Sequence, residues 1–229
     1  MKKQAASIIV FILMCMLLNL MGCSKKTETY YPVKEGQTWQ YQVSLGSMLG
    51  SEGGGKLVIT NLALRELKGK KVTPQKVELA GQTHFVFIAE DDNGIYEFAE
   101  QSPGSVEPQI KDSPAYLMKY PIKANNTWEE KTKTSLLKQN LSITLKSTIE
   151  STDETVTVPA GTFKSCLKVK GTGAAKKDLG ILGVANVSVE HHNWYAPGVG
   201  MVKTVLKENS NNMMVGSGEL TLQLESFKK

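Results

Sequence analysis

The side chains best suited to chemistry in this sequence are one cysteine and three histidines. Cys166, His84, His191 and His192 are of the types that serve as nucleophiles, general bases and metal ligands. Cys166 lies in an alternating segment, residues 164–168, and the histidines fall in other strand-like segments. We therefore interpret Cys166 as a packed or half-exposed structural cysteine, with a catalytic thiol as the alternative.

Metal binding finds little support in the spacing of these side chains. His191 and His192 are adjacent in a predicted strand, so their side chains point to opposite faces and at most one can join a given metal site. Residues 91–94, Asp-Asp-Asn-Gly, resemble the start of a calcium loop, but Ser102 occupies the twelfth position, where a glutamate is needed. We expect a turn at residues 91–94, and neither a metal nor another cofactor.

Residues 50–56, Gly-Ser-Glu-Gly-Gly-Gly-Lys, have the spacing of a phosphate-binding loop. Leu57 stands where a Ser or Thr should hold magnesium, and residues 56–60 begin a strand instead of the required helix. The sequence has no Gly-x-Ser-x-Gly motif, and its carboxylates show no spacing that singles out an acid/base pair. The prediction is a flexible loop and a protein that is not an enzyme, without catalytic residues.

The N-terminus has the pattern of an export signal. Two lysines precede an unbroken apolar run, residues 8–18, which has the length of a signal peptide core and is too short to span a bilayer. Leu20-Met21-Gly22-Cys23 follows and resembles the lipobox of bacterial lipoproteins, in which the cysteine is acylated after cleavage. We predict a signal peptide at residues 1–22 and a lipidated Cys23 with a polar tether at residues 23–29. An ordinary secretory signal is the alternative.

Acylation of Cys23 would anchor the mature chain to a membrane. Each buried methylene of a chain such as palmitate contributes about 0.8 kcal/mol, so two or three chains hold a protein permanently. In Gram-negative lipoproteins an Asp after the cysteine favours the inner membrane, so Ser24 implies the outer membrane if the organism is Gram-negative. Cys15 leaves with the signal, so Cys166 is the one free thiol of the mature chain and no intramolecular disulfide can form.

Composition indicates one globular domain over residues 30–229. Hydrophobic residues make up 41% and charged residues 21% of the 229, which fits neither a disordered chain nor a polytopic membrane protein. The formal net charge of +5 falls to +3 when Lys2 and Lys3 leave with the signal. Such a small, unclustered excess disfavours nucleic acid as a partner.

Short alternating segments, separated by Gly, Asn, Asp and Pro, predict a mainly β fold. We expect an antiparallel meander that forms a curved sheet or a partly closed barrel, with Asn93-Gly94 as a hairpin turn. Residues 61–70 and 132–141 are each open to a short helix instead. The predicted strands are residues 38–45, 56–64, 72–79, 83–90, 94–99, 141–149, 154–158, 163–169, 184–194, 199–206 and 219–227.

A nine-residue pattern occurs twice, at residues 31–39 and 120–128. The two copies share Tyr, Pro, Lys, Thr and Trp at matching positions, with Gly36 replaced by Asn125. We interpret them as two equivalent corners, each with a turn able to take positive φ and a Trp that is buried as a strand begins. A duplicated half-domain and a merely recurring turn both remain open.

Residues 31–41, 158–163 and 194–203 resemble a group of uncharacterised exported bacterial lipoproteins. The resemblance spans most of the mature chain. It implies an exported β-rich protein and supplies no catalytic residue. More distantly, the expected shape is similar to that of Lol-type lipoprotein carriers, whose curved antiparallel sheet holds acyl chains.

Two functions fit these observations. The first is a non-catalytic envelope module, structural or binding a protein or a cell-wall component. The second is a carrier or receptor for an apolar ligand such as a lipid or an acyl chain, with residues 179–189 and Met213-Met214 available to line or gate a cavity. A hollow interior with a mouth would favour the carrier, and a filled core would favour the binding module.

Overall fold

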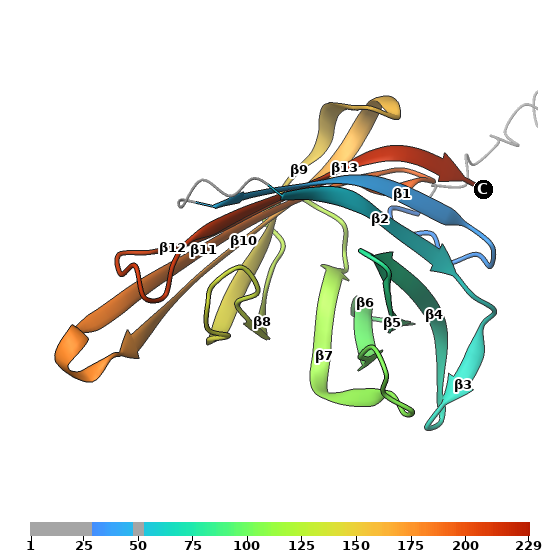
Figure 1. Ribbon diagram of the computed structural model, residues 1–229. Helices are drawn as coiled ribbons and strands as arrows, with labels where there is room; N and C mark the ends of the chain where they lie inside the picture. The colour runs from blue at the N-terminus through green and yellow to red at the C-terminus, as the bar shows by residue number, and fades with distance from the viewer. Residues whose placement is uncertain (1–28, 48–52) are drawn as a thin grey trace, which may run out of the picture.

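A computed structural model of the chain describes residues 29–47 and 53–229 (Figure 1). Cys23, the predicted signal peptide, most of the tether and residues 50–52 lie outside the described residues. Within them the chain forms one 13-stranded sheet, and the 3-10 turn Gly180–Leu182 is the one helical segment. The strands are β1 (Thr38–Ser47), β2 (Gly53–Asn61), β3 (Arg65–Leu67), β4 (Lys70–Leu79), β5 (Gln82–Asp91), β6 (Gly94–Gln101), β7 (Gln109–Lys119), β8 (Thr127–Lys133), β9 (Ser142–Val158), β10 (Gly161–Asp178), β11 (Val184–Ala196), β12 (Gly200–Ser210) and β13 (Gly218–Lys228).

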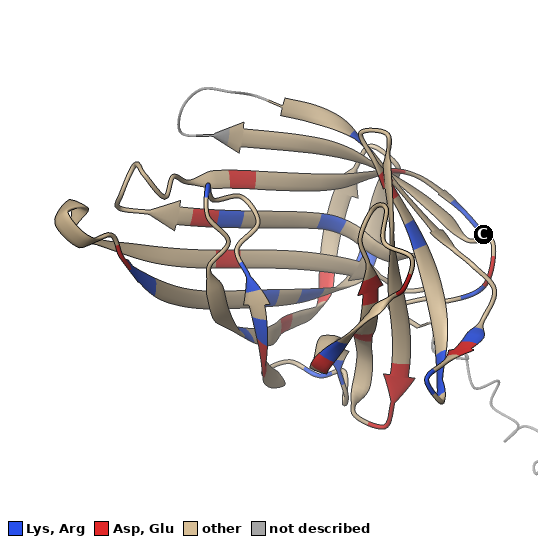
Figure 2. Cartoon of the chain, turned by 60° about the horizontal axis from the view of Figure 1, so that its bottom comes forward, with Lys and Arg blue, Asp and Glu red and all other residues tan. Residues whose placement is uncertain are grey.

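The sheet is an antiparallel meander whose first and last strands pair. Its order is β7-β6-β5-β4-β2-β1-β13-β12-β11-β10-β9-β8, with β3 hydrogen-bonded to β4 outside this path. The sheet curls so that its two edges, β7 and β8, approach one another, giving a nearly closed barrel (Figures 1 and 2). The predicted mainly β fold and partly closed barrel are confirmed. Every strand of the described residues lies within residues 38–228 and pairs with another strand in that range.

The barrel is open between its two edge strands, β7 and β8, and both have features that disfavour pairing. Glu97 and Ala99 of β6 pair with Ala115 and Ile110 of β7, which leaves residues 111–114 outside the ladder. This stretch ends in Pro114, which has no amide to donate. The charged side chains of β8 (Thr-Trp-Glu-Glu-Lys-Thr-Lys) protect the other edge. Neither β7 nor the body of β8 is among the predicted strands.

The predicted hairpin at Asn93-Gly94 is confirmed. Asp91 Oδ1 accepts the amides of Asn93 and Gly94 at 2.8 and 3.1 Å, which fixes the turn between β5 and β6. Gly94 has φ 147°, and a side chain there would collide with the Met118 carbonyl oxygen of β7. Residues 91–94 therefore form a turn, as expected from the missing calcium ligand.

The helix alternative for residues 61–70 is wrong. This segment contains β3 and a tight turn into β4, in which Lys68 and Gly69 have φ of 50° and 77°. Two successive residues with positive φ are typical of a type I′ hairpin turn, whose twist matches that of the two flanking strands. An α-helix cannot continue through such residues.

The helix alternative for residues 132–141 is wrong as well. After Lys133 the chain leaves β8 as a loop whose amides are bound by side chains. The buried Glu208 carboxylate accepts the amides of Ser135 and Leu136 at 2.8 to 3.1 Å, and Thr134 Oγ1 accepts the Leu141 amide at 2.8 Å. Amides held this way are unavailable to a helix.

The two copies of the repeated pattern form closely similar corners. Gly36 and Asn125 have φ of 81° and 67°, and each donates its amide to a carbonyl of a neighbouring strand, at 2.9 and 2.8 Å. Trp39 and Trp128 are buried, and each indole nitrogen donates to a backbone carbonyl, at 2.6 and 2.9 Å. The expected positive φ and buried Trp are present in both corners.

Candidate functional site

A cavity of about 360 Å³ lies inside the curled sheet. Its walls come from strands far apart in the sheet order, from β5, β6 and β7 on one side to β11 and β12 on the other, so the curvature of the sheet brings them together around a cavity that is partly open to solvent. Most of the lining is aromatic or aliphatic. These residues are Tyr31, Trp39, Tyr41, Ile59, Val77, Val86, Leu117, Tyr195, Met201, Leu206, Leu220 and Leu222.

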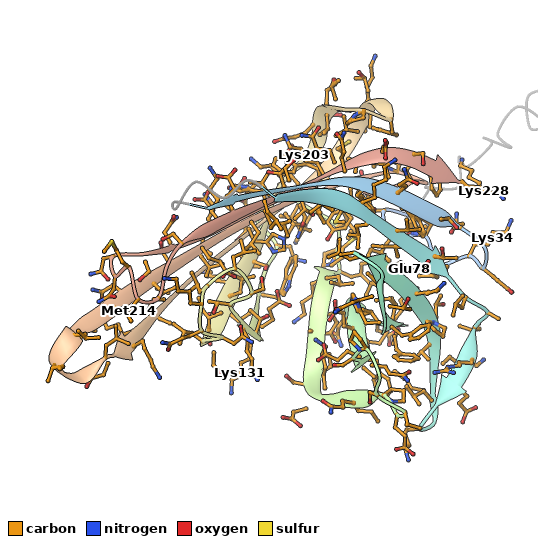
Figure 3. All side chains as sticks on the ribbon, viewed as in Figure 1. Lys34, Glu78, Lys131, Lys203, Met214 and Lys228 are labelled. Atoms are coloured by element: carbon orange, nitrogen blue, oxygen red, sulfur yellow. The ribbon has the colours of Figure 1, made fainter. Side chains whose placement is uncertain are left out.

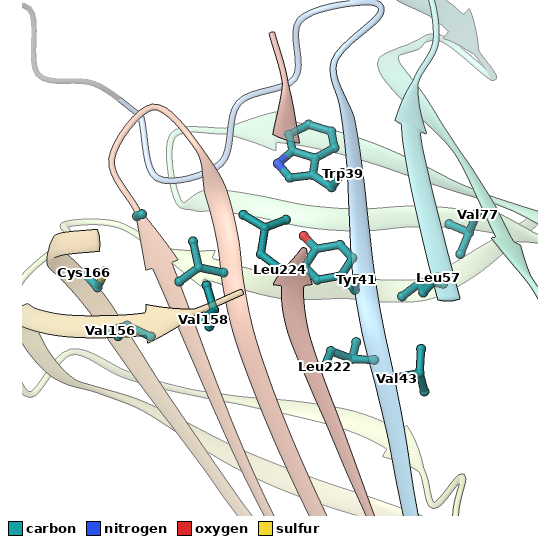
Figure 4. Packing of buried hydrophobic residues seen from close by; sticks show 12 residues of the cluster. Trp39, Tyr41, Val43, Leu57, Val77, Val156, Val158, Cys166, Leu222 and Leu224 are labelled. Atoms are coloured by element: carbon teal, nitrogen blue, oxygen red, sulfur yellow. The ribbon is translucent and has the colours of Figure 1, made fainter. Parts of the chain in front are cut away.

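Hydrogen bonds at the far ends of the aromatic side chains fix the cavity wall. Trp39 Nε1 donates to the Val199 carbonyl at 2.6 Å, and the Tyr41 hydroxyl donates to the Met201 carbonyl at 2.9 Å. Tyr41 and Leu222 come from the paired strands β1 and β13 and belong to one buried cluster (Figure 4). The rings therefore turn apolar faces to the cavity while their polar atoms are satisfied by the backbone.

A chain of side-chain hydrogen bonds ties the first corner to this wall. The Tyr31 hydroxyl donates to Gln75 Oε1 at 3.0 Å, and Gln75 Nε2 donates to Asn61 Oδ1 at 2.9 Å. Asn61 Nδ2 in turn lies 3.2 Å from the carbonyls of Pro32 and Lys34. Tyr31 and Pro32, which line the cavity, are thereby held in its wall.

Two histidines line the cavity, one on each side. His84 lies on β5 and His191 on β11. Burial, with a smaller effect of His192, lowers the pKa of His191 to about 4, so its ring is neutral at neutral pH and carries one donor and one acceptor. His192 faces the other side, where Nε2 lies 2.7 Å from Glu190 Oε1 and the ring stacks on Trp194. The prediction that adjacent histidines point to opposite faces is confirmed.

A second, larger space lies where the sheet fails to close. It measures about 1110 Å³ and is bounded by β7, β8, β9 and β10; we call it the slit. Its walls are polar, and its charged members are Glu100, Lys111, Asp112, Lys131, Lys133 and Lys176.

An ion pair stands between the cavity and the slit. Glu97 lines the cavity, Lys111 lines the slit, and Glu97 Oε2 lies 2.8 Å from Lys111 Nζ. Burial, followed by the Glu97 carboxylate, raises the pKa of nearby Glu130 to about 7, while Lys111 opposes this shift. The boundary between the two spaces is thus a small group of interacting charges.

The remaining predicted side chains lie elsewhere. Cys166 is fully buried beside Val156 and Val158, as the structural interpretation predicts, and burial raises the pKa of its thiol to about 11 (Figure 4). Lys56 lies within β2, with no helix after it. Across residues 29–47 and 53–229, no three His, Cys, Asp or Glu side chains gather as a metal site.

Residues 179–189 and Met213-Met214 contribute nothing to the cavity wall. Ala185, Val187 and Val189 are instead buried in a separate hydrophobic cluster, so ordinary core packing accounts for them, whereas Ile181 and Met213 project almost fully into solvent. In the part of the chain that the structure describes, no helix has the length and apolar character needed to cross a membrane.

The family model described as DUF3108-like matches residues 29–220, which include every cavity-lining residue except Leu222 and nearly the whole sheet. The chain belongs to the DUF3108-like family. The matched range includes residues 31–41, 158–163 and 194–203, the three segments that resemble exported lipoproteins. No curated protein matches the sequence.

Two solved structures are similar to this DUF3108-like chain. One is a candidate lipoprotein from Parabacteroides distasonis, at 18% identity and a TM-score of 0.41 over 89% of this chain and 100% of the other. The second is a candidate exported protein with a YmcC-like fold from Bacteroides fragilis, at 16% identity and a TM-score of 0.41 over 88% of this chain and 100% of the other. The similarity to Lol-type carriers stays a prediction.

Proposed function

We propose that the mature chain is a non-catalytic, lipid-anchored protein of the bacterial cell envelope that binds an apolar ligand, such as one acyl chain, inside its curved sheet. The observation that carries this proposal is the cavity. Of the two predicted functions, a hollow interior favours the carrier or receptor over a module with a filled core.

The size and chemistry of the cavity favour a slender, mostly apolar ligand. Ligand sites usually measure about 300 to 1,000 Å³ and combine apolar walls with a few polar groups. At about 360 Å³ this cavity is at the small end, with His84, His191 and Glu97 among its polar groups. An acyl chain would lie against Tyr41, Leu222 and their neighbours, and its polar end would meet one of these groups.

Anchoring is supported by the predicted lipobox and by where the described chain begins. The Gly198 amide donates to the Thr29 carbonyl at 2.9 Å, which fixes the start of the domain beside the turn between β11 and β12. Residues 24–28 span at most about 18 Å when extended. Acylated Cys23 would therefore hold this end of the domain close to the membrane, which is the outer membrane in a Gram-negative organism.

Native mass spectrometry of residues 24–229, followed by denaturing extraction, tests ligand binding directly. We expect a stoichiometric apolar molecule to co-purify, or added fatty acid to be taken up at one per chain. Val86→Trp, which places a large ring on the cavity wall, should lower uptake roughly tenfold or more, as a filled pocket excludes its ligand. Ala174→Trp in the slit wall is the matched control and should leave uptake unchanged.

A protein that purifies without a ligand and takes up neither fatty acid nor phospholipid would contradict the proposal. The non-catalytic binding module would then be the better account of the function. Equal uptake by the Val86→Trp and wild-type chains would also contradict it. Anchoring is tested separately, because the full chain should gain the mass of acyl groups and Cys23→Ser should not.

A further inference from the structure

Two neighbouring turns form an exposed apolar tip at one end of the sheet. The first is the 3-10 turn between β10 and β11, and the second is the loop between β12 and β13. Asn186 N donates to Asn211 Oδ1 at 2.8 Å, and Asn212 Nδ2 lies 3.4 Å from the Leu182 carbonyl, so the two turns are held together. Ile181, Leu182, Val184, Met213 and Met214 make up the apolar tip.

The apolar tip is unusual in how completely its side chains face water. Ile181 is 104% exposed and Met213 is 83% exposed, and the other three are each more than half exposed. Single exposed apolar residues are ordinary, but five on two adjoining turns form a patch of the kind that marks a contact surface. The cavity does not explain them, since none of the five lines it.

Three lysines lie near the apolar tip, and one of them, Lys176, also lines the slit. Lys176 and Lys177 precede the first turn, and Lys138 Nζ lies 3.2 Å from the Met213 carbonyl. The acids at this end are engaged with the backbone: Asp178 Oδ1 accepts the Gly180 amide at 2.8 Å, and Glu208 is buried against the loop amides. Figure 2 shows the hairpin end without charge, an acidic segment next to it and a basic segment farther back.

We propose that the apolar tip inserts into the surface of an anionic bilayer while Lys138, Lys176 and Lys177 bind the lipid phosphates. An apolar edge with lysines set behind it matches the layering of a membrane surface, where acyl chains lie below charged headgroups. Protein interfaces instead concentrate aromatic residues, Met and Arg at their centre and are depleted in Lys, and of these features the tip has only its two methionines. The tip has neither aromatic residues nor Arg, so lipid is the occupant that its chemistry fits.

The apolar tip is separate from the predicted tether. Thr29 lies beside the turn between β11 and β12, whereas the tip contains the loop at the other end of β12. An 11-residue strand spans about 36 Å. Figure 3 shows the same separation, with Met214 at one end of the sheet and Lys34 and Lys228 at the other. The tip therefore offers a second point of contact with lipid.

Co-sedimentation of residues 24–229 with phosphatidylcholine vesicles, with and without phosphatidylglycerol, tests this proposal. We expect binding to the anionic vesicles, reduced roughly fivefold or more by Ile181→Ser with Met213→Ser. Lys176→Glu with Lys177→Glu should weaken it by a similar factor. Leu64→Ser with Val106→Ser is the matched control, because these residues are 65% and 91% exposed but lie elsewhere, and it should bind as the wild type does.

No binding to anionic vesicles, or equal binding by the tip variant and its control, would overturn the proposal. A dimer in solution that the tip variant abolishes, with vesicles left unbound, would overturn it in favour of a second copy of the chain. Val86→Trp separates this inference from the proposed function: it should bind vesicles as the wild type does even though it loses fatty acid.

Discussion

The curled sheet encloses two spaces of opposite character, the cavity and the slit. The slit is about three times larger, yet charged and polar side chains form its walls, whereas the cavity is lined mainly by aromatic and aliphatic groups. Water hydrates charged walls readily, but apolar walls are better covered by an apolar ligand. Wall chemistry, more than volume, is therefore the reason for proposing the cavity as the ligand site.

The two spaces also differ in origin. The slit lies where the two edge strands, β7 and β8, are not hydrogen-bonded to one another, and residues 111–114 of β7 also lie outside its ladder with β6. The cavity exists because side chains from opposite walls stop short of one another. Substitutions in the packed wall of the cavity and substitutions that release the loop beside the slit should therefore change the free energy of unfolding by different amounts.

The largest expected effect separates packed from hollow regions on one strand. Leu224 is fully buried, whereas Leu222, two residues earlier on β13, lines the cavity. Leu224→Ala should lower the free energy of unfolding by about 3 to 5 kcal/mol. Leu222→Ala should lower it by only about 1 to 2 kcal/mol, because the side of Leu222 that faces the cavity has no packing contacts to lose. Urea denaturation measures both. Equal losses would mean that the cavity is filled by packing.

The second prediction concerns the loop that joins the slit-lining ends of β8 and β9. Glu208→Ala removes the acceptor of two loop amides and should cost about 2 to 3 kcal/mol of unfolding free energy. Glu219→Ala is the control, because this carboxylate is half exposed beside Lys207 and its loss should change stability by less than about 1 kcal/mol. A cost for Glu208→Ala as small as that of the control would show that the loop does not depend on this carboxylate.

The sequence predicted the cavity's surroundings better than the cavity itself. Alternation and turn residues were enough for the meander, the turn at Asn93-Gly94 and the two corners, since these depend on local backbone preferences. The strand β7 and the body of β8 were missed because the Pro114 and charged residues that protect a sheet edge also weaken the strand pattern. The slit between them was therefore missed too.

Cavity-lining residues carry almost the same pattern as core residues. Leu220 and Leu222 alternate with polar neighbours whether the space before them is filled or empty, so periodicity cannot reveal a void. The sequence did carry one sign of a cavity, which is polar residues at positions that face inward. Gln75 and His84 occupy such positions, in the same strands as the inward-facing Val77 and Val86. The loop at residues 134–141 depends on Glu208, more than sixty residues away, and no local pattern could show that contact.

The third prediction tests the cavity wall by pH. His191 has a folded pKa of about 4, below its ordinary 6.5, so the unfolded chain binds a proton that the folded chain excludes. Its contribution to stability is present above pH 6.5 and is lost as pH falls toward 4, amounting to about 2 kcal/mol. His191→Gln should remove this loss in urea denaturation at pH 7 and pH 4. An unchanged pH dependence would place His191 in contact with water.

The fourth and smallest effect comes from the boundary between the two spaces and has the opposite sign. Glu130 has a folded pKa of about 7, above its ordinary 4.5, so the folded chain holds a proton that the unfolded chain releases. The wild type should gain about 1 kcal/mol as pH falls from 7 to 4.5, after discounting for the partial exposure of Glu130. Glu130→Gln should abolish this gain, and Glu129→Gln, on the exposed side of β8, should keep it.

Because the windows of Glu130 and His191 overlap, their effects partly cancel in the wild type, and single variants are needed to separate them. Lys111→Met sharpens the assignment. Lys111 lowers the pKa of Glu130, so its removal should move the Glu130 transition to higher pH while that of His191 stays in place. If Lys111→Met instead moved both transitions together, the ion pair at Glu97 would no longer mark a boundary, and the cavity and the slit would be one continuous site.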